Sequence, residues 1–425
     1  MVVGGGHCGL AMSHALSRRG VEHVVLERGA VANSWRTERW DSLRLLTPNW
    51  MTRLPGQAYA GEDPDGYMSA GEVAAFLSAY ASTIAAPVLT GTTVLKVAPS
   101  AGGYRVSTDR GEWLCRALVL ASGAFNLPNL PSMASGIPGD VQQISAHRYR
   151  HPAQLAEGGV LVVGASATGL QLAREIQQSG RPVTLAVGEH VRMPRLYRGR
   201  DIQWWLLASG VLDQRIEEMD DPERARRLPS PQLVGTPERA TLDLNALQRQ
   251  GVSVVGRLAG IRDGTAQFSG SLRNVCALAD LKMNRLLDSF DDWARGLGAA
   301  CDLGTPERFA ATGLDDSPTL TLSLARRNIR TVLWATGGRP DHSWLDLPVF
   351  DRHGRLRHDR GIVDAPSLYV LGLPYLRRRK SSFIHGAEDD VREIAEHLVA
   401  GLGTRRVLAP QTIRWRKTQD RIRCE

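Results

Sequence analysis

The sequence predicts an α/β protein with two Rossmann-like dinucleotide-binding domains, in a three-layer ββα/βαβ arrangement with the second domain inserted into the first. Two glycine-rich turns, at residues 4–9 and 164–169, predict this fold because each stands between a short apolar strand and a helical run. A third observation is that the apolar strands at 118–121 and 332–335 both end in small-residue turns. We therefore expect two dinucleotides to bind side by side.

The first turn has the residues that a bound pyrophosphate requires. Gly4 permits the tight turn, Gly6 lets the phosphates approach the backbone, and Gly9 lets the helix lie close to the strand. The phosphates then lie against the N–H groups at the start of that helix. Glu27 follows Gly4 by 23 residues, close to the ~20 expected for an acid that binds a ribose hydroxyl. Only three residues precede Gly4, so we expect either a shortened first strand or a native start upstream of Met1.

The second turn departs from this pattern at one position. Its predicted cofactor contacts are Gly164, Ser166, Thr168 and Gly169, with Ser166 where the middle glycine is expected. The serine still allows a phosphate to approach, and its hydroxyl can donate a hydrogen bond. We expect the second dinucleotide to bind here.

Charged residues after the next predicted strand, 183–187, bear on which dinucleotide that is. Arg192 and Arg195 are placed to pair with a ribose 2′-phosphate, which favours NADPH. Glu189 is the opposing signal, because an acid near this point can bind a free 2′-hydroxyl. We predict NADPH, with NADH as the alternative.

The composition is that of a soluble enzyme. Of the 425 residues, 43% are hydrophobic and 23% are charged, which is ordinary for a globular chain of two or three domains. No apolar stretch reaches the ~18 residues of a membrane span, and the start has no signal-peptide pattern, so we expect a cytoplasmic protein. The five cysteines form no CxxC pair, which predicts neither a metal site nor an adjacent redox dithiol.

The net charge of +8 is concentrated at one end of the chain. Residues 401–425 hold seven Lys and Arg against two acidic residues, a net +5. A terminal tail without an RNA-binding motif does not predict a nucleic-acid partner. We expect a small-molecule substrate and O₂ as the partners, with a homodimer as a possible assembly.

Four segments organise the chain. We expect residues 1–155 to form the first part of one domain, 156–330 the second domain with a helical stretch at 275–293, 331–400 the return to the first domain, and 401–425 a basic tail. Residues 138–152 are interpreted as a linker. Ser69, with Glu72 three residues on, is predicted to cap a helix over 71–80. A final helix is predicted over 386–398.

These motifs, in this order, resemble the flavin-containing monooxygenases, and the resemblance covers roughly residues 1–400. It rests on both glycine turns, Glu27, and the segments 34–36, 46–49, 121–123 and 335–337 with Asp341. It implies that FAD binds the first domain and NADPH the second. It also implies that reduced flavin captures O₂ as a C4a-(hydro)peroxide, which transfers oxygen to a small nitrogen- or sulfur-containing nucleophile.

The resemblance also implies further site residues. Asn49 is the candidate catalytic residue at the flavin face, since an amide can donate and accept hydrogen bonds at once. The helix after His385 is expected to aim its N-terminus at the flavin. The other positions that the resemblance assigns to cofactor binding are Trp35, Arg36, Thr47, Gly123, Thr336, Gly337, Gly372 and His385. The run 377–380 is interpreted as a solvated loop, or alternatively as a site that attracts an anion.

The family's identifying motif, Phe-x-Gly-x-x-x-His-x-x-x-Tyr, is altered in this sequence. Ile137 replaces the phenylalanine, Ser145 replaces or displaces the histidine, and the spacing to Tyr149 is longer. Three alternatives therefore stay open: an NADPH-dependent flavin oxidase or reductase without oxygenation, a Baeyer–Villiger oxygenation of a ketone, and a flavin-sensing protein without turnover.

Overall fold

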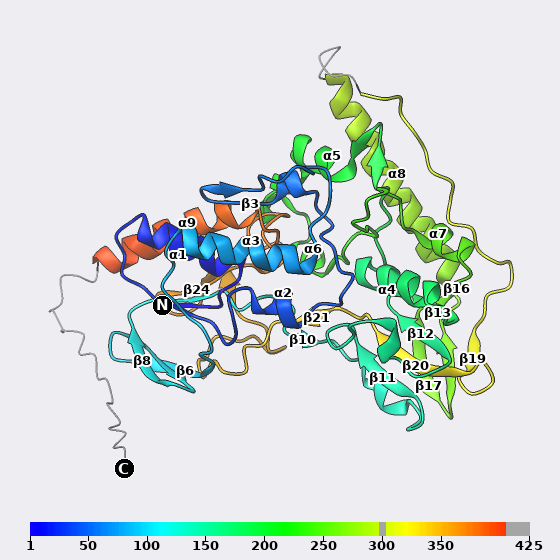
Figure 1. The fold of residues 1–425 in the computed structure, drawn as a ribbon, viewed down its shortest axis with the longest axis horizontal. Coiled ribbons are helices and arrows are strands. Elements are labelled where there is room, and N and C mark those ends of the chain that lie inside the picture. The colour runs from blue at the N-terminus through cyan, green and yellow to red at the C-terminus, as the bar shows by residue number, and fades with distance from the viewer. Residues whose placement is uncertain (297–302, 405–425) are drawn as a thin grey trace.

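The computed structural model describes residues 1–296 and 303–404 in two lobes joined by two crossing segments (Figure 1). The predicted basic tail lies outside the described residues from 405 onward, as do Cys301 and Cys424. Among the helices of the described ranges, none is both long enough and apolar enough to span a membrane.

The first lobe is built on a seven-stranded sheet in the order β22-β23-β24-β9-β1-β2-β5. Its five strands from β24 to β5 are parallel, and helices α1 (His7–Ser17), α3 (Ala70–Thr83) and α9 (Ala387–Thr404) pack in this lobe. The predicted capping box is confirmed, because Ser69 and Glu72 exchange hydrogen bonds at the start of α3. The strands are β1 (Val2–Val3), β2 (Val25–Leu26), β5 (Val88–Leu89), β9 (Leu118–Leu120), β22 (His358–Asp359), β23 (Ile362–Val363) and β24 (Leu368–Val370).

The second lobe repeats this arrangement. Its parallel sheet has the order β11-β20-β12-β13-β16, with helices α4 (Ala167–Gln178) and α7 (Leu244–Arg249) packed against it. Strand for strand it corresponds to β24-β9-β1-β2-β5, so the prediction of two Rossmann-like modules is confirmed. The strands are β11 (Gln142–Ser145), β12 (Gly159–Val163), β13 (Val183–Val187), β16 (Ser253–Gly256) and β20 (Ile329–Trp334).

Each module also carries a three-stranded antiparallel sheet in its long crossover. The first crossover has β6 (Val94–Ser100), β7 (Gly103–Thr108) and β8 (Gly111–Cys115), and the second has β17 (Leu258–Arg262), β18 (Thr265–Phe268) and β19 (Thr321–Ser323). The equivalence of the two modules thus extends beyond the nucleotide turns to the connections between their strands.

Two of the predicted domain boundaries are wrong. The segment 138–152, interpreted as a linker, contains β11, which pairs in parallel with β20 at the edge of the second sheet. The boundary at 330/331 cuts through β20, whose Ile329 to Trp334 pair with β12. The second domain therefore begins before residue 156 and ends after residue 330, because the chain that leaves and re-enters the first domain contributes two neighbouring strands.

The helical insertion of the second domain joins the two lobes. It contains α5 (Ile202–Ala208), α6 (Pro222–Arg227) and the long α8 (Leu272–Gly296), which includes the predicted 275–293. Figure 1 shows α5 and α6 near the first lobe, and α6 contacts both lobes, since Glu223 pairs with Arg355 of the first and Arg224 lies 3.9 Å from Glu189 of the second. Residues 212–216 run along 377–380, with Ile216 N donating to Arg377 O (2.8 Å) and Lys380 N donating to Leu212 O (3.2 Å).

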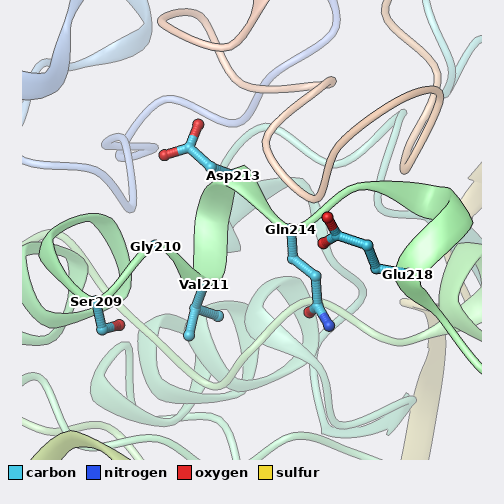
Figure 2. A pocket seen from close by; sticks show the side chains of 6 residues that line it. All are labelled: Ser209, Gly210, Val211, Asp213, Gln214 and Glu218. Carbon is cyan, nitrogen blue, oxygen red and sulfur yellow. The ribbon is translucent and has the colours of Figure 1, made fainter. Parts of the chain in front are cut away.

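Contrary to the first interpretation, the basic run 377–380 is not a solvated loop. The side chains of Arg377, Arg378 and Lys380 are buried and ion-paired. Lys380 lies between Asp389 of α9 (2.8 Å) and Asp213 of the insertion. Figure 2 shows Asp213 pointing away from the Ser209, Val211 and Gln214 side chains of an open depression of about 460 Å³. Asp213 is also one of the residues that line this depression.

Close backbone approach in both glycine turns explains why glycine recurs there. Gly4 and Gly164 have φ of +109° and +110°, in the region that disfavours side chains. A Cβ on Gly9 would lie 1.9 Å from the carbonyl oxygen of Gly4, and a Cβ on Gly169 would lie 1.8 Å from that of Gly164. Each helix can therefore pack against its strand only if its third residue is glycine.

We expect Gly9→Ala to lower the free energy of unfolding by about 1–3 kcal/mol, because the methyl group has to displace a backbone carbonyl. Gly6→Ala is the matched control, since its φ is −86° and, within the described structure, no atom lies within 4 Å of a Cβ at that position. Urea unfolding of both variants checks this. Equal losses of stability in the two variants would contradict it.

Candidate functional site

The first glycine turn and Glu27 lie together where the phosphate and ribose site is predicted. The buried Glu27 carboxylate accepts hydrogen bonds from Gly5 N (2.7 Å, Oε2) and from Gly29 N (3.0 Å, Oε1). These hydrogen bonds fix the backbone of the glycine turn. Glu27 also lies at the end of β2, where a ribose is expected. The open space beside Gly6, at the N-terminus of α1, leaves room for a pyrophosphate.

Asn49 lies in the short 3₁₀ turn Asn49–Met51 and is buried. Its backbone N–H donates to Gly66 O (2.8 Å) and its Nδ2 donates to Asp63 O (2.9 Å). Its Oδ1 is buried and, among the described residues, has no hydrogen-bond partner. An unpaired buried carbonyl oxygen is costly, so this atom is suited to a ligand.

His385, which lies beside the start of α9, also has a buried polar atom without a partner among the described residues. It is buried, its Nε2 has no partner within residues 1–296 and 303–404, and its ring lies 5.6 Å from that of Phe383. Burial lowers the pKa of His385 to about 3, with Lys380 and Arg53 contributing in the same direction. The imidazole is therefore neutral at physiological pH.

The surroundings of these two side chains fit a flavin ring. Thr52 Oγ1 is a third buried polar atom that lacks a partner in the described chain. Met51 and Phe383 belong to one apolar cluster with residues of α5 and α8, which places the 49–52 turn, the start of α9 and the insertion together. A flavin has a polar edge for such atoms and an apolar face for such a cluster, so these residues fit FAD.

The remaining predicted residues of the first domain lie around the glycine turn. Trp35 is half-buried in α2 (Asn33–Thr37) with Arg39 5.1 Å above its ring, and Arg36 donates to Val31 O and Ser78 Oγ. Gly123 and Gly372 have positive φ, and a Cβ on Gly372 would lie 3.0 Å from Cys8 Sγ on α1. Thr47 lies just before the Asn49 turn. Their contact with FAD stays a prediction.

Thr336 and Gly337 lie where the two lobes join. The Thr336 hydroxyl donates to Asn129 O, and Gly337 has φ of +77°. An open depression of about 520 Å³ lies here, lined by Pro128, Asn129, Leu130, Pro131, Thr336 and Arg339. These two residues thus hold the crossing of the chain between the domains.

Ser166 reproduces the geometry of the glycine that it replaces. It precedes α4 with φ of −82° and ψ of −174°, against −86° and −174° for Gly6 before α1. These values are accessible to any residue, so serine costs no backbone strain. Its hydroxyl makes no capping bond within the described structure. Thr168 lies in the first turn of α4, so both hydroxyls are at the N-terminus of the helix.

The prediction that Arg192 and Arg195 bind a 2′-phosphate is wrong, because both guanidinium groups are inside the protein. Arg192 is 5% exposed and bonds Asp243 (2.6 Å) and Asp280 (2.6 Å). Arg195 is 0% exposed and pairs with Asp201. Their carboxylate partners, which are distant in sequence or on another element, could not be identified from the sequence pattern.

The register of the strands shows which residues lie at the predicted ribose position of the second module instead of Arg192 and Arg195. Gly4 N and Gly164 N donate to Leu26 O and Ala186 O, so Val187 takes the place of Glu27 in the second module. No acid therefore stands at that position to bind a free 2′-hydroxyl. The side chain of Arg257 passes over the next residue, Gly188, with its Cδ 3.5 Å from where a Cβ would be.

Glu189, the signal that favoured NADH, is not an isolated acid. Its carboxylate lies 3.5 Å from Lys282 Nζ and 3.9 Å from Arg224 Nη2. Lys282, Arg224 and Arg257 thus bring three cations to the end of β13. No pattern in the sequence indicated these three cations, because they lie 35 to 93 residues after Glu189.

Comparison with known proteins agrees with this geometry. Residues 1–219 match the model of the pyridine nucleotide-disulphide oxidoreductase family. An uncharacterized CzcO-like oxidoreductase of Geobacillus kaustophilus is 30% identical over 402 residues, which are 94% of this chain and 96% of that protein. The chain belongs to the pyridine nucleotide-disulphide oxidoreductases. The predictions of an enzyme, of an oxidoreductase, and of FAD and NADPH as cofactors are confirmed at this level.

The resemblance to flavin-containing monooxygenases is also confirmed for the fold. The flavin-containing monooxygenase of Stenotrophomonas maltophilia superposes with a TM-score of 0.64 at 21% identity, over 94% of this chain and 97% of that one. The rice indole-3-pyruvate monooxygenase YUCCA1 is 32% identical over 200 residues, about half of each protein. This oxidoreductase therefore shares its architecture with oxygenating relatives.

The lowered pKa of His385 makes a prediction about acid stability. The unfolded chain takes up a proton at the ordinary histidine pKa of 6.5, whereas the folded chain does so only near 3. Stability from this group is therefore complete above pH ~6.5 and is lost as the pH falls, by about 1.4 kcal/mol per unit.

We expect His385→Gln to flatten the dependence of unfolding free energy on pH by about that slope between about pH 6 and 4. Urea unfolding at several pH values measures it, and the difference at pH 8 reports the change in packing alone. Parallel curves for the two proteins would contradict the assignment.

Proposed function

We propose that this oxidoreductase is a flavin-dependent monooxygenase that uses NADPH and O₂ to oxygenate a small nitrogen- or sulfur-containing nucleophile. The observation that carries the proposal is the buried Asn49 side chain, whose Nδ2 donates within the protein while its Oδ1 has no partner among the described residues, next to the apolar cluster of Met51. Such a site suits a reactive flavin that has to be shielded from water. The oxygenating relatives support this choice.

The placement of cysteines disfavours disulfide chemistry, which the family also includes. In the described part of the chain, Cys8, Cys115 and Cys276 are unpaired and lie in α1, β8 and α8. Burial raises the pKa of the Cys8 thiol, with Asp390 adding to the shift, so it is a weak nucleophile. A flavin that oxygenates its substrate requires no protein thiol.

The residues of the site then have separate tasks. The turn at 4–9 and Glu27 bind the phosphates and ribose of FAD, and the turn at 164–169 binds those of NADPH. Asn49 Oδ1 accepts a hydrogen bond from a cofactor, and neutral His385 contributes a polar ring without a charge. The apolar cluster around Met51 and Phe383 excludes water. FAD supplies the reaction with O₂.

Rapid mixing tests the proposal. The FAD-loaded protein is reduced with NADPH and then mixed with oxygen, while flavin absorbance is followed. We expect NADPH to reduce the flavin and an oxygenated-flavin band to persist for seconds while NADP⁺ is bound. Immediate return to oxidised flavin with stoichiometric hydrogen peroxide would contradict oxygenation and indicate an oxidase or reductase. Substrates are then screened among amines, sulfides and ketones, where turnover of ketones alone would indicate Baeyer–Villiger chemistry.

The choice of NADPH has its own test. We propose that Arg257 and Lys282 bind the 2′-phosphate, since Val187 replaces the acid and Gly188 leaves space. Arg257→Ala should raise the KM for NADPH about 10-fold, the loss of one charge-assisted contact, and leave that for NADH unchanged. Steady-state NADPH and NADH oxidation measures both. A KM that rises equally for the two coenzymes would contradict this assignment.

A further inference from the structure

Arg195 forms a buried contact between the two domains. It follows β13 in the second domain and has no exposed surface. Its Nη1 donates to Leu46 O (2.8 Å), its Nη2 pairs with Asp201, and its guanidinium lies 4.9 Å from the centre of the Tyr67 ring. Leu46 and Tyr67 both belong to the first domain. One side chain therefore contacts the flavin domain twice.

Asp201 and Tyr67 also contact each other, so Arg195, Asp201 and Tyr67 form a cluster in which each side chain contacts the other two. The Tyr67 hydroxyl donates to Asp201 Oδ2 (2.7 Å), while Asp201 Oδ1 receives Arg195. Burial, reinforced by Asp201, raises the pKa of the Tyr67 phenol, so it stays protonated and donates. The two carboxylate oxygens of Asp201 therefore bond different partners, Tyr67 of the first domain and Arg195 of the second.

The cluster of Arg195, Asp201 and Tyr67 lies against the turn that carries Asn49. Leu46 is three residues before Asn49, and the backbone of this turn is held on its other side by residues 63–68. Leu45 N donates to Met68 O (2.8 Å) and Trp50 N to Pro64 O (2.8 Å). Those contacts lie within the first domain. From the second domain, Arg195 donates a buried hydrogen bond to Leu46 O at this turn, beside the apolar contact of Met51 with α5 and α8.

We propose that Arg195 is a positioning residue for hydride transfer, because it holds the Asn49 turn in register with the domain that presents NADPH. This inference rests on the proposed function. The step is transfer of a hydride, two electrons with one proton, from NADPH to FAD, leaving NADP⁺ and reduced flavin. Its rate falls steeply when donor and acceptor are misplaced, by as much as ~100-fold for ~1 Å. Arg195 touches neither reacting atom in this assignment and acts through the turn.

Arg192 provides a matched control. It is the same residue type, three positions earlier and nearly as buried, but its partners Asp243 and Asp280 are both in the second domain. Removing either arginine leaves buried carboxylates unpaired, so both variants lose stability. Only removal of Arg195 releases the turn of the first domain.

The experiment compares Arg195→Met, Arg195→Lys and Arg192→Met as FAD-loaded proteins. We expect Arg195→Met to slow flavin reduction by saturating NADPH ~10- to 100-fold and to leave reduction by dithionite unchanged. Arg195→Lys should recover part of the rate, since an ammonium can still pair with Asp201. Arg192→Met should stay within about 3-fold of the parent rate because its partners do not touch the turn.

Hydrogen–deuterium exchange adds a readout that does not depend on turnover. The amides of 45–52 should exchange faster in Arg195→Met than in the parent protein, and at the parent rate in Arg192→Met. If Arg195→Met does not fold, Tyr67→Phe replaces it, which removes only the hydroxyl that bonds Asp201. We expect that variant to show a smaller change in the same two measurements.

Two results would overturn the inference: equal slowing of flavin reduction in the Arg195 and Arg192 variants, or unchanged exchange of 45–52 when Arg195 is removed. A parent protein whose flavin NADPH does not reduce is a different failure. It would contradict the proposed function, and the exchange measurement would still decide whether Arg195 holds the turn.

Discussion

Both halves of the structure depend on one close approach, that of the first turn of a helix to the backbone of the strand before it. Gly9 lies over the carbonyl of Gly4, and Gly169 lies over that of Gly164, at separations that leave no room for a side chain. The approach directs the helix N-terminus along the carboxyl end of the parallel strands. It thereby places helix N-termini at the two turns where the cofactor phosphates are predicted to bind.

The two modules are equivalent in backbone but differ in chemistry. Ser166 has the backbone conformation of Gly6, and Val187 has the place of Glu27, so the second module keeps the phosphate site and loses the ribose acid. In place of that acid, Arg257 and Lys282 bring positive charge to the same strand end. One fold thus carries different side chains at corresponding positions of its two modules.

Buried charge holds these modules together. The insertion contacts the first domain through Lys380 between Asp213 and Asp389, and through Arg195 between Asp201 and Leu46. Such groups are expensive to bury and are stable only with all partners in place. They therefore favour one arrangement of the domains over others in which the same apolar surfaces would be covered. Arg195 contacts Leu46, three residues before Asn49, and Lys380 lies near His385, so each contact is close to one of the two candidate site residues.

The sequence by itself determined the two nucleotide modules, the capping box of α3 and the first-domain acid Glu27, because these features depend on residues within about 25 positions of one another. It identified Asn49 and His385 only through resemblance, and their buried unpaired atoms became visible in the structure. The predictions for Arg192, Arg195 and the run 377–380 were wrong, since a basic residue in a polar stretch of sequence is usually exposed. Several of their partners lie on other elements and are distant in sequence, as Leu46 is from Arg195 and Asp213 is from Lys380. Only the tertiary structure decided whether those charges face solvent, a cofactor or a buried carboxylate, because that depends on which elements pack together.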